Sequence, residues 1–180
     1  STTSNEVNSS RGELLDARQF QHIVGEFMNI TIPRYCDSLV KNRYHNGHPD
    51  LIPSATFSGD AVQYTTEGIE VKGSRHASGW QGHNPEAIWL MVFHFESNTA
   101  NDSQSDIGPK PFQFLGVYAA KLDLEDWTFS GRSATSRRTI TASVNQRGVK
   151  KMKSNWVYRV LQSVYSLKKS SENVNSLICS

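Results

Sequence analysis

Two acidic residues and a lysine in the first half of the chain, Asp50, Glu70 and Lys72, have the types and spacing for metal-dependent chemistry. Glu70 and Lys72 stand in "GIEVKGS", which predicts a strand, and the two-residue period of a strand places both side chains on one face. If Asp50 opens a neighbouring strand, its carboxylate lies next to that of Glu70. Two adjacent carboxylates repel unless a cation lies between them, and Mg²⁺ accepts one or two carboxylates together with water and a substrate phosphate.

Such a site predicts hydrolysis of a phosphodiester. The metal would polarise the phosphodiester and lower the pKa of a bound water. Lys72 could position or deprotonate the attacking water, or stabilise charge on the phosphate. Burial would lower the pKa of Lys72 and the two acids would raise it, and the sequence leaves open which effect is larger.

The same residues resemble a known family. Pro49-Asp50 followed by Glu70-x-Lys72 resembles the PD-(D/E)XK nuclease superfamily, the fold of type II restriction endonucleases and several repair nucleases. The strings "GHPDLIP", "EGIEVKGSR", "WQGHNPE" and "WLMVF" are similar to those of restriction-endonuclease-like bacterial proteins, over roughly residues 10–165. The resemblance implies that Asp50 and Glu70 bind Mg²⁺, with Mn²⁺ as an alternative, and that Lys72 is the catalytic lysine. Some members add a glutamate from the first helix, and Glu26 is the best-placed match here.

Simpler interpretations of these residues stay open. Glu70 and Lys72 could form cross-strand ion pairs on a solvated face, and Asp50 could be a turn residue after proline. Asp60, in Ser-Gly-Asp, is an alternative first acid. Glu26 could be an ordinary polar-face residue, and Glu13 also lies on the expected helix.

The loop after Lys72 carries groups that could hold substrate. Gln81, His83 and Asn84 can donate hydrogen bonds to phosphate or water, and Trp80 is either a core residue or a stacking platform for a base. Histidines also occur near both motifs, but no two of them have the paired spacing of a zinc site near a third ligand. They are His45, His48, His76 and His83.

A basic segment follows later in the chain. From Phe129 to Arg159 the sequence has eight basic residues and no acid, while the remaining 11 of its 19 basic residues stand against 17 acidic ones. This asymmetry predicts a polyanionic partner, and the resemblance implies that this partner is double-stranded DNA; the alternative is a solvated basic face without a ligand. The candidate DNA-binding residues here are Arg132, Arg137, Arg138, Arg147, Lys150 and Lys151, followed by Lys153 and Arg159.

Composition places the chain among globular proteins. Its 180 residues, 37% hydrophobic and 20% charged, fit a single domain with a sizeable core. No apolar run is long enough to span a membrane, no leader is visible, and Cys36 and Cys179 form no disulfide framework, so a cytoplasmic protein without membrane contact is expected. We expect a flexible tail over 1–9, one nuclease-like domain over 10–170 and a C-terminal tail over 171–180.

Helices are expected near both ends of the chain. Ser10 and Glu13 at capping-box spacing predict the start of the first helix, which Pro33 should end or bend. A shorter helix is expected within 35–44 and a last one over 155–169, where apolar residues recur at helical spacing. The apolar face of the first helix would consist of Leu14, Leu15, Phe20, Ile23, Val24, Phe27 and Met28.

Strands are expected between these helices. The stretch 87–97 is nearly all apolar, which predicts a central strand. The segment 124–155 is expected to be irregular with one strand-like piece over 139–144. The other expected strands cover 50–57, 61–66, 68–74 and 112–123. This order predicts an α/β or α+β fold with a restriction-endonuclease-like core, in which helices flank a central mixed β-sheet.

Together these features predict a Mg²⁺-dependent endonuclease that hydrolyses DNA in restriction or another defence against foreign DNA. One alternative is a non-catalytic DNA-binding module with a decayed nuclease fold. Another is a repair or structure-specific nuclease with the same active site. A homodimer is expected by analogy, since two active sites are needed to cut both strands.

Overall fold

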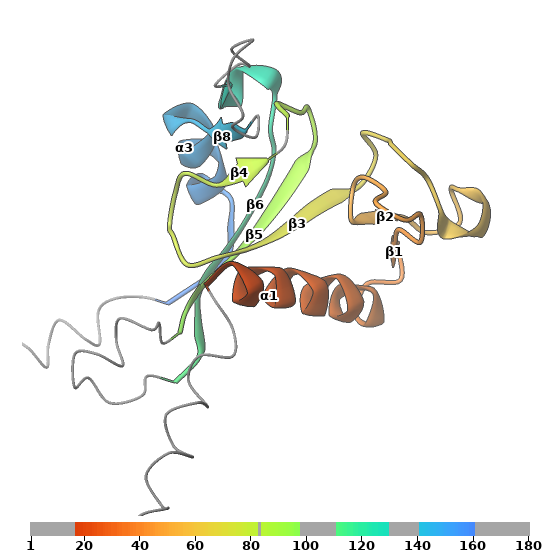
Figure 1. Cartoon of the computed structure of the whole chain (residues 1–180), viewed down its shortest axis with the longest axis horizontal. Helices are drawn as coiled ribbons and strands as arrows, with labels where there is room; N and C mark the ends of the chain where they lie inside the picture. The colour runs from red at the N-terminus through yellow and green to blue at the C-terminus, as the bar shows by residue number, and fades with distance from the viewer. Residues whose placement is uncertain (1–16, 83, 98–110, 130–140, 161–180) are drawn as a thin grey trace, which may run out of the picture.

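The computed structural model of the chain describes residues 17–82, 84–97, 111–129 and 141–160, which form a mixed α/β structure (Figure 1). The expected tails over 1–9 and 171–180 and the expected helix start at Ser10 lie outside these residues. The elements in chain order are α1 (Ala17–Thr31), η1 (Ile32–Arg34), β1 (Leu39–Lys41), β2 (Leu51–Pro53), η2 (Ser58–Asp60), β3 (Ile69–Ser74), β4 (Gln81–Gly82), β5 (Trp89–Glu96), β6 (Gln113–Lys121), η3 (Leu124–Asp126), β7 (Trp127–Phe129), β8 (Ala142–Val144), α3 (Gln146–Ser154) and β9 (Trp156–Arg159).

Six strands form a mixed sheet in the order β1-β2-β3-β5-β6-β9, and β4-β8-β7 form a smaller second sheet. Only β3 and β5 run parallel in the large sheet; its other neighbours are antiparallel. The expected central position of β5 is confirmed, because β5 pairs with β3 from Ile69↔Trp89 to Ser74↔His94 and with β6 on its other side.

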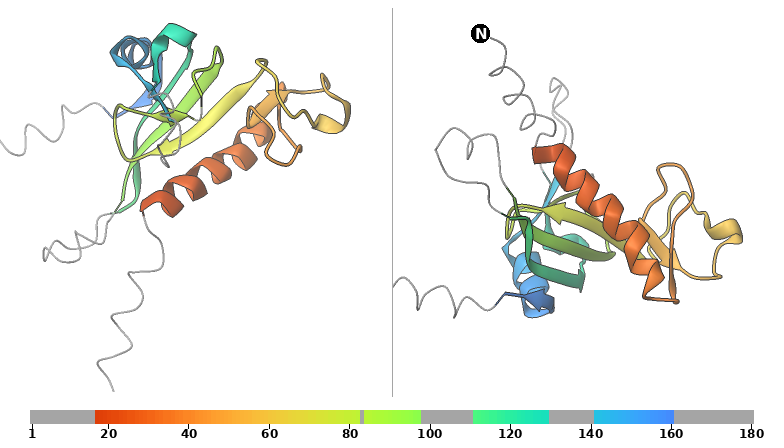
Figure 2. Two further views of the ribbon diagram at one scale, coloured as in Figure 1. Left: turned by 45° about the horizontal axis from the view of Figure 1, so that its top comes forward. Right: turned by 90° about the horizontal axis from the view of Figure 1, so that it is seen from below.

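The large sheet is covered on both faces (Figures 1 and 2). Helix α1 lies across one face, where Val24 packs with Val71, Phe93 and Phe95. The small sheet and α3 lie against the other face, where a second core includes Leu90, Val92, Trp127, Val144 and Met152. No helix in the described part of the chain is long and apolar enough to cross a membrane.

Helix α1 buries a narrower apolar face than its sequence predicts. Phe20, Val24 and Met28, spaced four residues apart, pack toward the sheet. Ile23 and Phe27 were expected on the same face but are 46% and 60% exposed. They belong to a second stripe, one residue earlier at each turn, which points away from β3.

The region after α1 is extended rather than helical. The helix expected within 35–44 is wrong, because residues 39–41 form β1 and pair with β2, from Leu39↔Pro53 to Lys41↔Leu51. The strand expected over 61–66 is also wrong. In that stretch only an isolated bridge joins Tyr64 to His48.

The C-terminal half differs most from the expectation. Residues 146–154, expected to be irregular, form α3, whose first turn is capped by the Asn145 side chain accepting from the Gly148 N–H. The helix expected over 155–169 is contradicted where it is described, since Trp156–Arg159 form β9 and pair with β6. Bulky aromatic and β-branched residues fit this edge of the sheet better than a helix. The strand-like piece within 139–144 is present as β8.

Candidate functional site

The predicted catalytic residues Asp50, Glu70 and Lys72 lie close together where β2 separates from β3. In the described structure β2 pairs with β3 only through Leu51 and Ile69, which leaves the edge of β3 beyond Ile69 open. Gly68 permits this close approach: its φ is +139°, and a Cβ there would lie 2.1 Å from the Leu51 carbonyl oxygen. No residue with a side chain fits this position.

Asp50 occupies the open edge of β3. Its Oδ2 accepts a hydrogen bond of 2.9 Å from the backbone N–H of Val71. This bond satisfies a donor that would otherwise face a missing strand. The antiparallel register of Leu51 with Ile69, extended by one residue, sets Asp50 opposite Glu70, so the two carboxyl groups lie on the same face.

A pocket of about 570 Å³ between α1 and this edge collects the candidate residues. Its lining includes Asp50, Glu70 and Lys72, together with Glu26 from α1. Asp60, the alternative first acid, lies in η2 and does not line the pocket. The spacing-based prediction of adjacent carboxylates is therefore matched by the geometry, with Asp50 rather than Asp60 beside Glu70.

Cations on two sides hold the Glu70 carboxylate. Lys72 Nζ donates to its Oε1 at 2.8 Å, and His48 Nδ1 lies 3.1 Å from its Oε2. Burial acts to raise the pKa of Glu70, but His48 and Lys72 outweigh burial and bring this pKa down to about 2. Glu70 is thus ionised at any physiological pH.

The pKa of Asp50 is shifted in the opposite direction, upward. Burial, and then the negative charge of Glu70, raise the pKa of Asp50 to about 6, although Val71 N–H and Lys72 act to lower it. Two neighbouring acids with pKa values driven apart in this way are typical of functional sites, where like charges are held close together.

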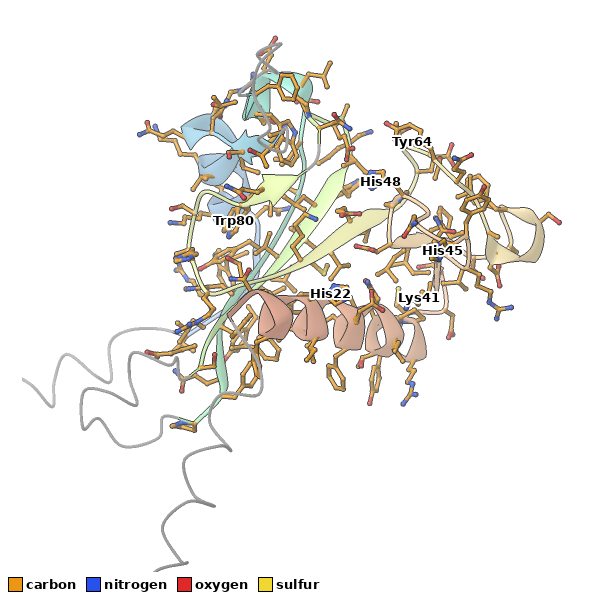
Figure 3. The ribbon with its side chains drawn as sticks, in the orientation of Figure 1. His22, Lys41, His45, His48, Tyr64 and Trp80 are labelled. Atoms are coloured by element: carbon orange, nitrogen blue, oxygen red, sulfur yellow. The ribbon has the colours of Figure 1, made fainter. Side chains whose placement is uncertain are left out.

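His48 is a part of this site that the sequence argument missed. Its Nε2 lies 2.8 Å from Glu86 Oε2, so the ring bridges two carboxylates, and it stacks on Tyr64 at a centroid distance of 5.6 Å (Figure 3). Burial opposes its charge, but the two neighbouring acids Glu70 and Glu86 raise the pKa of His48 to about 9. The signal for this role was its position two residues before Asp50.

Asn42 holds the loop that carries His48 and Asp50. The buried Asn42 side chain donates to the carbonyls of Pro49 and Val62 and accepts from the N–H groups of Tyr44 and Val62. Its backbone N–H also donates to the Asp50 carbonyl at 2.8 Å. A single buried amide thus joins three segments, and no local pattern in the sequence indicates it.

Helix α1 adds two oxygen-bearing side chains to the pocket. Glu26 Oε2 accepts from Lys41 Nζ at 2.7 Å, and this contact lowers the pKa of Glu26. Asn29 is only 3% exposed, and its Oδ1 is buried without a hydrogen-bond partner. Since buried polar atoms are nearly always satisfied, this oxygen is available to accept a hydrogen bond from water or from a ligand in the pocket.

The loop residues have separate positions. Gln81 is exposed and lines a second hollow beside Lys72, whereas Asn84 is exposed outside both hollows. Trp80 is a core residue, 3% exposed, with its Nε1 donating to the His76 carbonyl. His83 lies outside the described residues.

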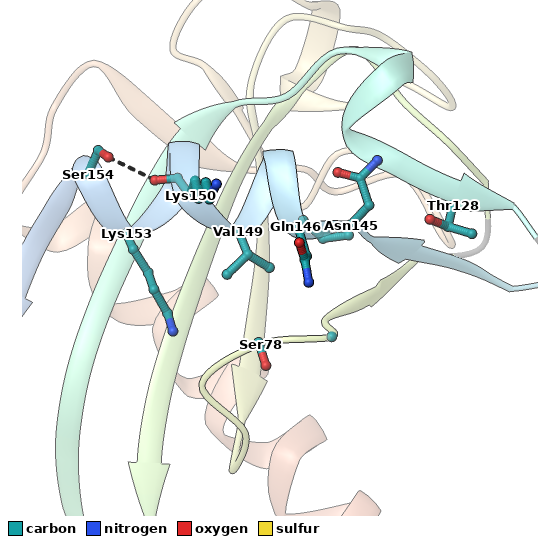
Figure 4. A pocket seen from close by; sticks show the side chains of 10 residues that line it. Ser78, Thr128, Asn145, Gln146, Val149, Lys150, Lys153 and Ser154 are labelled. Atoms are coloured by element: carbon teal, nitrogen blue, oxygen red, sulfur yellow. Dashed lines mark hydrogen bonds between the residues drawn. The ribbon is translucent and has the colours of Figure 1, made fainter.

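The basic segment is partly neutralised by three acids that precede it. Arg147 pairs with Glu125 and Asp126, and Lys151 pairs with Asp123 and Asp126. These two predicted DNA-binding residues therefore anchor α3 to η3. Lys150 and Lys153 instead line a large surface pocket (Figure 4). Arg132, Arg137 and Arg138 lie outside the described residues.

In the described part of the chain, no three His, Cys, Asp or Glu side chains converge into a ready-made metal cage. The two carboxylates of Asp50 and Glu70, with Glu26 and Asn29 nearby, form a more open arrangement of hard oxygen donors. Comparisons with protein-family models, with curated proteins and with solved structures find no match to this chain.

Proposed function

We propose that the chain is a Mg²⁺-dependent endonuclease that hydrolyses DNA phosphodiester bonds, with a core like that of the restriction endonucleases. The observation that carries this proposal is the pairing of Asp50 and Glu70 at an open strand edge with Lys72 beside them. A simple ion pair between Glu70 and Lys72 on a solvated strand face would not need a second acid beside it. Restriction, or another defence against foreign DNA, is the setting that we propose.

The donor set fits Mg²⁺, or Mn²⁺ in its place. Mg²⁺ is usually held by one or two carboxylates plus water and substrate phosphate rather than by a complete protein cage, which agrees with the open arrangement here. Asp50 and Glu70 would hold the ion, and the unpartnered Oδ1 of Asn29 would accept from one of its water ligands. When bound, the ion polarises the phosphodiester and lowers the pKa of a water molecule.

The side chains of the chain itself have distinct tasks in this proposal. Lys72 Nζ, fixed by Glu70, donates to the attacking water or to a phosphate oxygen. His48 keeps the Glu70 carboxylate oriented toward the pocket, and Glu86 holds His48. The Glu26 carboxylate can bind a ligand in the pocket only if its ion pair with Lys41 opens. Asp50 is positioned by the Val71 N–H and needs no side-chain partner to face Glu70.

Plasmid cleavage tests the proposal. Wild-type protein with Mg²⁺ should nick or linearise methylated or unmethylated supercoiled DNA, and Asp50→Asn, Glu70→Gln and Lys72→Ala should each lower the rate by about 10²–10⁴-fold. Asp60→Asn is the matched control, because it removes an acid outside the pocket. No cleavage of any DNA by the wild type, or full activity in all three variants, would reject the proposal.

One observation favours a second candidate, a DNA-binding module with a decayed nuclease site. Glu70 is already neutralised by His48 and Lys72, so its charge is not free for a metal. Calorimetry with Mn²⁺ separates the two, since the module should bind DNA but no metal.

A repair or structure-specific nuclease would share the active site, and only a panel of branched, mismatched and single-stranded substrates distinguishes it. The homodimer stays a prediction, tested by sedimentation.

A further inference from the structure

Three hollows adjoin along one side of the molecule. The pocket of Asp50 and Glu70 shares Gln21, Lys72 and Gly73 with a second hollow of about 410 Å³. That hollow shares Ser78 and Gly79 with a third, of about 1040 Å³, beneath α3. Because neighbouring hollows share lining residues, they follow one another from the open edge of β3, past the loop after β3, to α3, and we call this row of hollows the furrow.

The charge of the furrow changes along its length. Its first part holds the acids Glu26, Asp50 and Glu70. The lining of the second and third parts contains no acid, and the charged groups there are Lys72, Lys150 and Lys153. A polyanion would therefore meet attraction along the furrow and repulsion only at its acidic end, where a divalent cation reverses the sign.

The lysines of the third part differ from their neighbours on α3. Arg147 and Lys151 are held by acids of the segment before β7, whereas Lys150 and Lys153 form no ion pair with the described residues. Figure 4 shows the Lys153 side chain extending from α3 toward the side where Ser78 lies. The helix thus uses one set of cations for anchoring and presents another to the furrow.

We propose that this furrow seats one strand of the DNA substrate, with the scissile phosphate at Asp50 and Glu70 and further phosphates of the same strand against Lys153 and Lys150. This inference rests on the proposed function and adds to it the path of the substrate. The second part, with exposed Ser78 and Gln81, lies between the two ends and offers only neutral donors and Lys72 to the backbone.

Binding of a fluorescent duplex in Ca²⁺ tests the path apart from cleavage. Lys150→Gln with Lys153→Gln should weaken binding about ten-fold or more and reduce the slope of log Kd against log salt by about 1.8, near 0.9 for each phosphate that is no longer neutralised. Arg34→Gln with Lys121→Gln is the matched control, since it removes the same two charges from exposed residues outside the furrow. Urea unfolding of both pairs checks that the fold is retained.

A second pair of variants tests continuity. Ser78→Glu places a negative charge where the second and third hollows meet and should weaken binding, while Ser54→Glu, in an exposed turn, should not. If the Lys150 and Lys153 variant binds as its control does, the path is rejected even when the wild type cleaves DNA. If the wild type binds no DNA, the path and the proposed function both fall.

Discussion

The Asp50 carboxyl caps the strand that carries Glu70, through a hydrogen bond of 2.9 Å from the Val71 N–H to Asp50 Oδ2. The contact that completes the β3 edge is therefore the same contact that sets two acids side by side. Because the backbone rather than a cation holds Asp50 in place, the like charges stay adjacent in the free protein. Their repulsion destabilises the folded protein, and this effect should be measurable in the unfolding free energy.

Asp50→Asn should stabilise the free protein at neutral pH. The amide oxygen can still accept from Val71, while the cost of burying a charged carboxylate and the repulsion from Glu70 are both gone. Because the pKa of Asp50 is raised from 3.8 to about 6 on folding, the folded protein binds more protons in this window and its unfolding free energy falls as pH rises through it, by up to about 3 kcal/mol. Urea unfolding at several pH values should show this fall in the wild type and in Asp60→Asn but not in Asp50→Asn; equal slopes would contradict it.

Mg²⁺ should remove the same destabilisation. An ion bound only by the folded protein stabilises it by about 2.7 kcal/mol at a hundred-fold excess over Kd. Thermal unfolding with and without Mg²⁺ should therefore shift for the wild type and much less for Asp50→Asn or Glu70→Gln. Mn²⁺ should act in the same way, and a shift that survives both substitutions would place the ion elsewhere.

His48 should give the protein a second pH dependence. Its pKa is raised from 6.5 to about 9 by Glu70 and Glu86, so its contribution to stability is complete below pH 6.5 and is lost as pH rises through about 9. His48→Gln should lower the unfolding free energy by about 3 kcal/mol at pH 6 and by little at pH 10. His45→Gln, on an exposed loop residue, is the control; an identical loss at both pH values would reject the charge-based account.

The sequence predicted the strands that have a strong apolar pattern and the residues attached to them. Glu70 and Lys72 were placed by the period of β3, and Asp50 followed from pairing of two neighbouring strands. What the sequence could not give were contacts between distant segments. Asn42 bonds with Val62, and His48 lies between Glu70 and Glu86, and neither contact leaves a periodic trace.

In the C-terminal half, sequence patterns did not predict the secondary structure because contacts between distant segments determine it. Helix α3 has few apolar residues; besides Met152, which is buried in the core, the Asn145 cap and acids more than twenty positions earlier hold it in place. The count of basic residues was correct, but Asp123, Glu125 and Asp126 lie just before the segment and neutralise part of it. The number of basic residues in the segment therefore overestimates the positive charge that remains after these ion pairs form.

A pair of glycines should report how closely α1 must approach β3. A Cβ on Gly73 would lie 2.5 Å from the Gln21 carbonyl oxygen, so Gly73→Ala should cost about 1–3 kcal/mol by pushing the helix outward. A Cβ on Gly25, on the facing helix, would lie no nearer than 3.8 Å to any atom outside that helix, and Gly25→Ala should stabilise the helix by up to about 1 kcal/mol. Urea unfolding of both variants compares them, and a tolerated Gly73→Ala would mean that the approach is looser than the structure has it.

Asp126 should matter far more than its neighbour Glu125, although both pair with Arg147. Asp126 is fully buried, and its carboxylate takes Lys151 at 3.0 Å, Arg147 at 3.3 Å and the Asp123 N–H at 2.8 Å. Asp126→Ala removes the buried acceptor of the Asp123 N–H and the shared partner of two cations, and should cost about 1–3 kcal/mol. The Glu125 side chain is 81% exposed, so Glu125→Gln should cost less than about 1 kcal/mol.

The same two variants separate anchoring from DNA binding. Asp126→Ala removes ion pairs that hold α3 to η3, so it should weaken DNA binding indirectly and also lower the unfolding midpoint. Loss of the furrow lysines Lys150 and Lys153 should weaken binding with the midpoint unchanged, because neither forms an ion pair with the described residues. Measuring unfolding and duplex affinity on all variants therefore gives two separable patterns, and a drop in the midpoint of the Lys150 and Lys153 variant would assign these lysines to the fold instead.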